Sequence, residues 1–132
     1  MNKDIGDIID RWSILKLKYE RIGSPEVVKE YEVYQKEMLL LSKKKYVPEI
    51  SQLMYDVNGF IWVLESGLKG GKESLKNPHY LFDQLNEGAL VNIGIASVLI
   101  RNFNHVRISI KNLVNKIEGQ GHPEKKGDHL SC

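Results

Sequence analysis

Apolar residues recur every three or four positions along most of the chain, the spacing that places side chains on one face of an α-helix. The first stripe predicts a helix from Ile5 to about Gly23, with Asp4 as its N-cap and the glycine accepting the left-handed conformation at its end. A second helix is predicted to start directly afterwards, because Ser24 suits the N-cap and Pro25 suits the first helical position.

The second half of the chain predicts two longer helices. Pro48 opens the third, and the Gly70-Gly71 pair is expected to stop it. Asn77 suits an N-cap and Pro78 the first position of a last helix, as Ser24 and Pro25 do for the second. From there to Ile117 no residue forces the helix to end, although Gly88 could kink or split it. No stretch of useful length alternates with the period of a strand. The pattern therefore predicts an all-α protein, an antiparallel bundle of three to four helices with a long C-terminal helix.

Length and composition fit one soluble domain. The chain has 132 residues, of which 42% are hydrophobic and 27% charged, and these values exclude global disorder. We expect residues 1–118 to form a helical domain and residues 119–132 to form a flexible tail without apolar periodicity. The single cysteine, Cys132, excludes an intrachain disulfide and favours a reducing compartment. With no recognisable leader or membrane-spanning stretch, the expected location is the cytoplasm.

The first half of the last predicted helix, Gly88–Ile100, is apolar on nearly every face. A helix of this kind must be surrounded, and three other short helices cover only part of its perimeter. This predicts a homo-oligomer, a dimer or tetramer that associates through its helices. The alternative is an ordinary central core helix. The net charge of +2 is too balanced for a nucleic-acid coat, so neither a nucleic-acid polymer nor a membrane is expected as a partner.

Catalytic signatures are absent from the sequence. There is no Walker-type phosphate loop, no HExxH and no CxxC. The Glu-x-x-Glu spacing with which all-α nucleotide pyrophosphatases hold Mg²⁺ does not occur among Glu26, Glu30, Glu32 and Glu37. The histidines come from distant segments, which gives no reason to expect a metal site: His79, His105, His122 and His129. We therefore predict a protein that is not an enzyme and has no catalytic residue, metal or cofactor.

Polar donors nevertheless recur at helical spacing beside the apolar stripes. Amide groups read base edges, guanidinium pairs with phosphate, and an indole ring stacks on a nucleobase, so such a set suits an anionic, nucleotide-like ligand. The candidate ligand-binding residues are Arg11, Lys18, Asn58, Trp62, Asn104, Arg107, Lys111 and Asn115. The alternative is that these side chains form the solvated face of the bundle.

Three motifs resemble a small all-helical bacterial family of unknown function. The first is the segment from Ile9 to Ile22, which reads IDRWSILKLKYERI; the others are Val57-Asn58 with Trp62 and Glu65, and Asn104, Arg107, Lys111 and Asn115. The resemblance covers most of residues 5–117. It departs from the family pattern at residues 66–68, and the register of the last motif slips by about two residues. The resemblance implies a helical fold and no particular activity.

The overall character of the chain also resembles the small phage-encoded sponge proteins (anti-CBASS proteins) that oligomerise and sequester cyclic nucleotide immune signals. This resemblance implies a non-catalytic homo-oligomer in the bacterial host cytoplasm, with cyclic dinucleotides such as cGAMP as its first candidate ligands. Phosphates would be held by Arg11, Arg107 and Lys111. Bases or ribose would be read by Asn58, Asn104 and Asn115, with Trp62 stacking.

Two other functions fit the same sequence. One is a helical protein-interaction or scaffold module, in which the apolar part of the last helix docks a partner chain. The other is an enzyme acting on a nucleotide or sugar substrate, with Asp10, Glu20 or Glu65 as its base.

Overall fold

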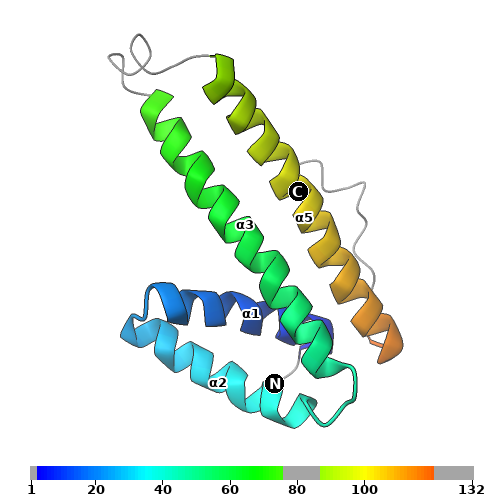
Figure 1. The fold of residues 1–132 in the computed structure, drawn as a ribbon. Helices are drawn as coiled ribbons and strands as arrows, with labels where there is room; N and C mark the ends of the chain where they lie inside the picture. The colour runs from blue at the N-terminus through cyan, green and yellow to red at the C-terminus, as the bar shows by residue number, and fades with distance from the viewer. Residues whose placement is uncertain (1–2, 76–86, 121–132) are drawn as a thin grey trace.

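The computed structural model describes residues 3–75 and 87–120 and confirms the all-α class. These residues form four helices and no strand: α1 (Ile5–Arg21), α2 (Pro25–Leu41), α3 (Val47–Leu75) and α5 (Glu87–Ile117) (Figure 1). Over the described residues, no helix combines the length and the hydropathy that crossing a membrane requires.

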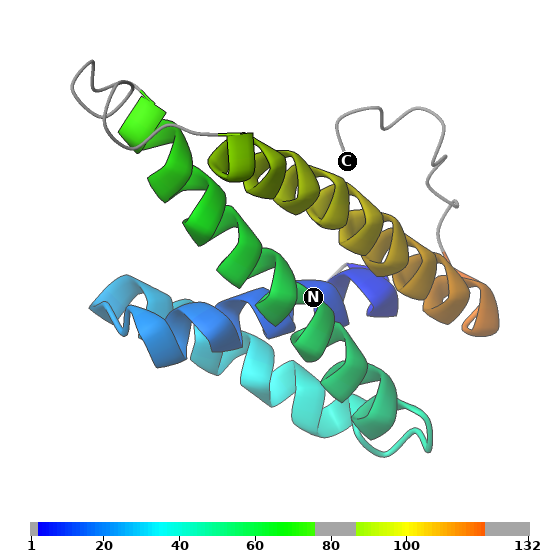
Figure 2. The same cartoon turned by 45° about the horizontal axis from the view of Figure 1, so that its top comes forward.

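The helices form two antiparallel pairs that cross each other. The shorter pair is α1 and α2, and the longer pair is the hairpin of α3 and α5 (Figures 1 and 2). Helix α1 packs against each of the other three helices, so it is the element that joins the two pairs. The short pair lies across the lower part of the hairpin, and the upper part extends beyond it.

The buried core lies where the four helices meet. It is built from the apolar stripes that the sequence predicted, and its most deeply buried side chains are Ile9, Leu15, Val47, Met54 and Val114. On α3 the last buried side chain is Ile61, and on α5 the first is Ile108, among the side chains that the structure describes. We call the part beyond them, residues 62–75 of α3 and 87–107 of α5, the outer hairpin. None of its described side chains is buried, although Phe103 packs against the edge of the core.

Local signals set the boundary between α1 and α2 as predicted. Gly23 has a φ of 65°, the left-handed conformation that glycine accepts at the end of a helix. Ser24 caps α2, because its hydroxyl oxygen accepts a hydrogen bond from the Val27 N–H at 3.4 Å. Pro25 is the first residue of α2, where its missing N–H costs nothing.

Two predictions about the longer helices have different outcomes. The predicted stop at Gly70-Gly71 is wrong, because α3 continues to Leu75. Each glycine lowers helix propensity by about 1 kcal/mol but does not forbid helical geometry, so a helix already established over several turns can pass through the pair. The predicted start of the last helix at Asn77-Pro78 lies outside the described residues. From Glu87 to Ile117 the last helix is continuous.

The end of α5 is fixed to the start of α1 and to the α2–α3 connection. Gly119 and Gln120, at the start of the predicted tail, belong to this junction: the Gln120 N–H donates to the Asn115 carbonyl oxygen at 2.7 Å, and its side chain accepts from the Ile5 N–H at 2.9 Å. The Tyr46 hydroxyl donates to Glu118. Burial and this hydrogen bond raise the pKa of Tyr46, and the same bond lowers the pKa of Glu118. Residues 121–132 lie outside the described residues.

Candidate functional site

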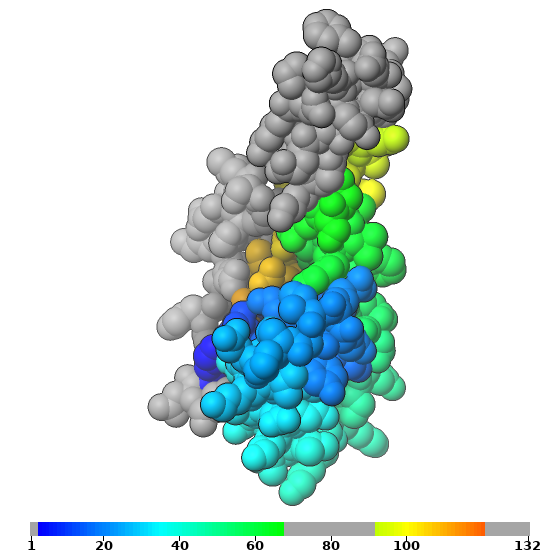
Figure 3. Space-filling model, turned by 90° about the vertical axis from the view of Figure 1, so that its left-hand side faces the viewer, coloured from blue at the N-terminus to red at the C-terminus, as the bar shows by residue number. Residues whose placement is uncertain are grey.

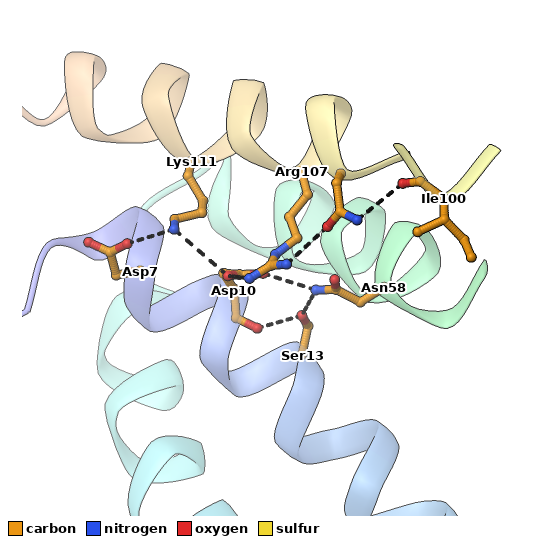
Figure 4. A network of polar contacts seen from close by, with 8 residues as sticks. Asp7, Asp10, Ser13, Asn58, Ile100, Arg107 and Lys111 are labelled. Carbon is orange, nitrogen blue, oxygen red and sulfur yellow. Dashed lines mark hydrogen bonds and ion pairs between the residues drawn. The ribbon is translucent and has the colours of Figure 1, made fainter. Parts of the chain in front are cut away.

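A buried polar cluster occupies the crossing of α1 with α3 and α5 (Figure 4). Its centre is Asp10, whose side chain is only 7% exposed. Arg107 of α5 holds this carboxylate with two parallel bonds, Nε to Oδ1 at 2.8 Å and Nη2 to Oδ2 at 3.0 Å. Asn58 of α3 donates to the same Oδ1 at 3.0 Å. Three helices therefore converge on one carboxylate, in the bidentate geometry that makes arginine–carboxylate pairs strong.

Ser13 completes the inner part of this cluster. The second donor contact of the Asn58 amide goes to the Ser13 hydroxyl at 2.6 Å, and that hydroxyl donates to the Asp10 carbonyl oxygen at 2.7 Å. Both side chains are buried. A buried polar group costs stability unless it is hydrogen-bonded, and here the bonds form a closed chain.

Two more residues of α5 and one of α1 surround the centre. Lys111 Nζ lies 3.1 Å from Asp7 Oδ1 and 4.0 Å from Asp10 Oδ2. Arg107 Nη1 also donates to Asn104 Oδ1 at 3.2 Å. We call this set of residues the Asp10 network: Asp7, Asp10, Ser13, Asn58, Asn104, Arg107 and Lys111. Its two cations stand against two carboxylates, so a phosphate bound by Arg107 or Lys111 would compete with an aspartate already in place.

Asn115 lies one turn beyond Lys111 and has a structural partner. Its side-chain oxygen accepts a hydrogen bond from the Gly6 N–H at 2.8 Å. A Cβ atom on Gly6 would lie 2.6 Å from the Lys111 carbonyl oxygen and 2.7 Å from Asn115 Oδ1. Only glycine therefore fits where the first turn of α1 rests on α5. Asp4 occupies the predicted N-cap position but makes no side-chain cap, because Asn115 and Gln120 accept from the first N–H groups of α1 instead.

The remaining predicted residues lie along α1 and α3. Arg11 pairs with Glu30 of α2 at 2.8 Å on an exposed surface. Trp62 lies beside Arg21, whose guanidinium carbon is 5.6 Å from the ring centre. Lys18 is half-buried farther along α1. The structure thus brings together Asn58, Asn104, Arg107 and Lys111, and places Arg11, Lys18, Trp62 and Asn115 outside the Asp10 network.

A second group of side chains comes from α1 and α3, and of its members sequence reasoning predicted only Trp62. Lys16 Nζ lies 5.4 Å from the centre of the Trp12 ring and 4.6 Å from that of Tyr55. Such cation–aromatic contacts contribute about 0.5–1 kcal/mol at exposed sites. The Tyr55 hydroxyl donates to Glu20, which raises the pKa of Tyr55. We call Trp12, Lys16, Arg21, Tyr55 and Trp62 the aromatic–cation face.

The network members that the sequence did not predict as ligand-binding residues are Asp7, Asp10 and Ser13. A usable signal existed, because Asp7 and Asp10 are three residues apart and share a helix face, as Arg107 and Lys111 do at four. This spacing did not show that the face with Asp7 and Asp10 packs against the face with Arg107 and Lys111. Among the described residues, no group of three or more His, Cys, Asp or Glu side chains is placed to hold a metal ion.

Comparisons with known proteins add no relative. No protein-family model matches the chain, and searches of curated proteins and of solved structures found no match. The resemblances drawn from the sequence therefore stay predictions.

Proposed function

We propose that this protein is a non-catalytic helical binding module whose partner is a second copy of the same chain, held through the outer hairpin. One observation carries the proposal. Between Asn92 and Arg107 of α5, no described side chain is buried, although half of these residues are apolar. Exposed large side chains there include Ile95, Val98 and Leu99. Contiguous apolar surface on a small protein usually marks an interaction site.

The shape of the molecule explains why a single chain leaves this surface exposed. The surface of α1 and α2 ends partway up the hairpin, and α3 continues beyond it (Figures 1 and 3). Among the described residues of α3, Val63 is an exposed apolar side chain of the outer hairpin, and Phe60 lies exposed just before it with its ring stacked on Phe103 at 5.4 Å. The outer hairpin supplies only two helices, so a helix of a second copy would cover the apolar side of α5 that they leave exposed.

Replacing Leu99 with glutamate (L99E) is expected to convert the assembled protein to monomer, because the carboxylate would be buried without a partner at the interface. The matched control is L40E, which makes the same change at an exposed leucine on α2, away from the outer hairpin. Sedimentation velocity should show the same assembled species for wild type and L40E, and a monomer for L99E. A monomeric wild type, or an L99E variant that sediments like L40E, would overturn the proposal.

A second candidate function is sequestration of an anionic, nucleotide-like small molecule, and the aromatic–cation face favours it. There a cation lies next to each aromatic ring, at Lys16 with Trp12 and Tyr55 and at Arg21 with Trp62. A ring for the base and a cation for the phosphate are the two parts that nucleotide recognition requires. In the Asp10 network the cations already face carboxylates. Cyclic dinucleotides such as cGAMP are the first candidates, because an assembled protein would present two such faces.

Isothermal titration against a panel of cyclic nucleotides tests this candidate. We expect measurable binding to wild type and, for W62A, about tenfold or greater weakening, since stacking contributes about 1–3 kcal/mol per base. The control is K29A, which removes an exposed lysine of α2 and should leave affinity unchanged. Absence of heat with every nucleotide removes this candidate and leaves the self-association proposal standing. A ligand recovered chemically altered would instead support the enzyme alternative.

A further inference from the structure

A single apolar stripe runs along the exposed side of α5. Leu99, Val106 and Leu113 are spaced seven residues apart, and Ile95 and Ile117 extend the stripe by four residues at each end. All five are exposed, at 52% for Ile95, 38% for Leu99, 42% for Val106, 52% for Leu113 and 58% for Ile117. A repeat of seven is the pattern of a seam between two paired helices. At about 1.5 Å per residue the stripe is about 33 Å long.

A polar atom without a partner lies beside the middle of the stripe. His105 Nε2, next to Val106, is buried and has no hydrogen-bond partner among the described residues. Val106 itself is 42% exposed and is the central residue of the stripe.

We propose that the occupant is α5 of a second copy, running antiparallel about a two-fold axis at Val106. This inference rests on the self-association proposed above and assigns its surface and direction. The stripe has the same order of residue types from either end: isoleucine, leucine, valine, leucine, isoleucine. Rotation about Val106 therefore places each Leu99 against a Leu113 and each Ile95 against an Ile117. A surface that complements itself in this way is what a two-fold interface needs.

Charge favours the antiparallel direction. The part of α5 from Asn92 to Ile117 carries Arg101, Arg107, Lys111 and Lys116 and no acidic residue. Lys116 flanks the stripe, and parallel pairing would set it beside the same lysine of the second copy, where like charges are destabilising. Antiparallel pairing about Val106 sets Lys116 opposite Ala96 instead. Arg101 and Lys111 lie about 140° round the helix from the stripe and do not meet the seam in either direction.

Disulfide trapping tests the direction and register in full-length protein with Cys132 replaced by serine. V106C should cross-link to a covalent dimer under mild oxidation, because a disulfide needs Cα atoms within about 7 Å and the axis brings the two copies of this position together. L99C alone and L113C alone should stay monomeric on a non-reducing gel, whereas their mixture should cross-link. The control is V33C, an exposed valine on α2, which should not cross-link.

The outcomes distinguish antiparallel pairing through α5 from self-association in general. Cross-linking of L99C and of L113C each on its own would show parallel pairing and overturn the antiparallel register. Failure of V106C and of the L99C–L113C mixture, in protein whose light-scattering mass is still that of a dimer, would overturn pairing through α5 and leave self-association intact. A monomeric mass before oxidation would overturn both.

Discussion

Replacing Asp10 with alanine (D10A) is expected to lower the free energy of unfolding by about 3 kcal/mol in urea denaturation. Breaking a buried ion pair from one side costs about 3–5 kcal/mol, because the other charge loses its partner while it stays partly desolvated. The lower end applies because the Arg107 side chain is 31% exposed and gains some water. The same change removes the Asp10 acceptor of the Asn58 amide.

The chain contains a matched control for D10A. Arg11 and Glu30 form an ion pair with the same 2.8 Å separation, but their side chains are 40% and 46% exposed. Exposed pairs contribute about 0.2–1 kcal/mol, so E30A should shift the unfolding midpoint only slightly. If D10A also lowers the free energy of unfolding by less than about 1 kcal/mol, the Asp10 network is solvated and contributes little to stability. Arg107 and Lys111 would then be available for the phosphate-binding role that the sequence suggested.

Replacing Gly6 with alanine (G6A) is expected to destabilise the protein by about 2 kcal/mol, although helix propensity alone predicts a gain of up to about 1 kcal/mol. The added Cβ would meet the Lys111 carbonyl oxygen at 2.6 Å, and a backbone carbonyl cannot move without shifting the helix. Overpacking of this kind costs about 1–3 kcal/mol. Moving α1 away would also lengthen the hydrogen bond from the Gly6 N–H to Asn115.

The same glycine-to-alanine change is expected to have the opposite effect on stability at another helical position. Gly67 lies within α3, and a Cβ there would have nothing within 4 Å. G67A should therefore stabilise the protein by about 0.5–1 kcal/mol through the conformational entropy of the unfolded chain. Thermal and urea unfolding of both variants give the comparison. A G6A protein as stable as G67A would contradict the close contact between α1 and α5.

Local signals predicted local structure well. The Gly23, Ser24 and Pro25 run fixed the junction of α1 and α2, because each residue acts through its own backbone preference. The Gly70-Gly71 pair wrongly predicted the end of α3, because low helix propensity is a weak effect that the surrounding structure overrides. The start of α1 could not be predicted in detail, since its first N–H groups are satisfied by Asn115 and Gln120 from the far end of the sequence.

The candidate site was predicted in part. Spacing placed Asn104, Arg107 and Lys111 on one face of the last helix; in the structure Arg107 and Lys111 both contact aspartates of α1, and Asn104 accepts a hydrogen bond from Arg107. Spacing could not identify those neighbours as Asp7 and Asp10, because periodicity fixes the face of a helix and not the helix that crosses it. The apolar stretch before Arg101 was predicted to need cover from another copy of the chain. Its burial in an assembly remains the proposal.

Size-exclusion chromatography with light scattering on the wild-type chain tests the central claim most directly. The chain mass is 15.2 kDa. We predict a single species of about twice that mass or a larger even multiple, as closed symmetric homo-oligomers built from dimers require. A mass of 15.2 kDa at every concentration loaded would contradict the claim that the outer hairpin is an interface between copies.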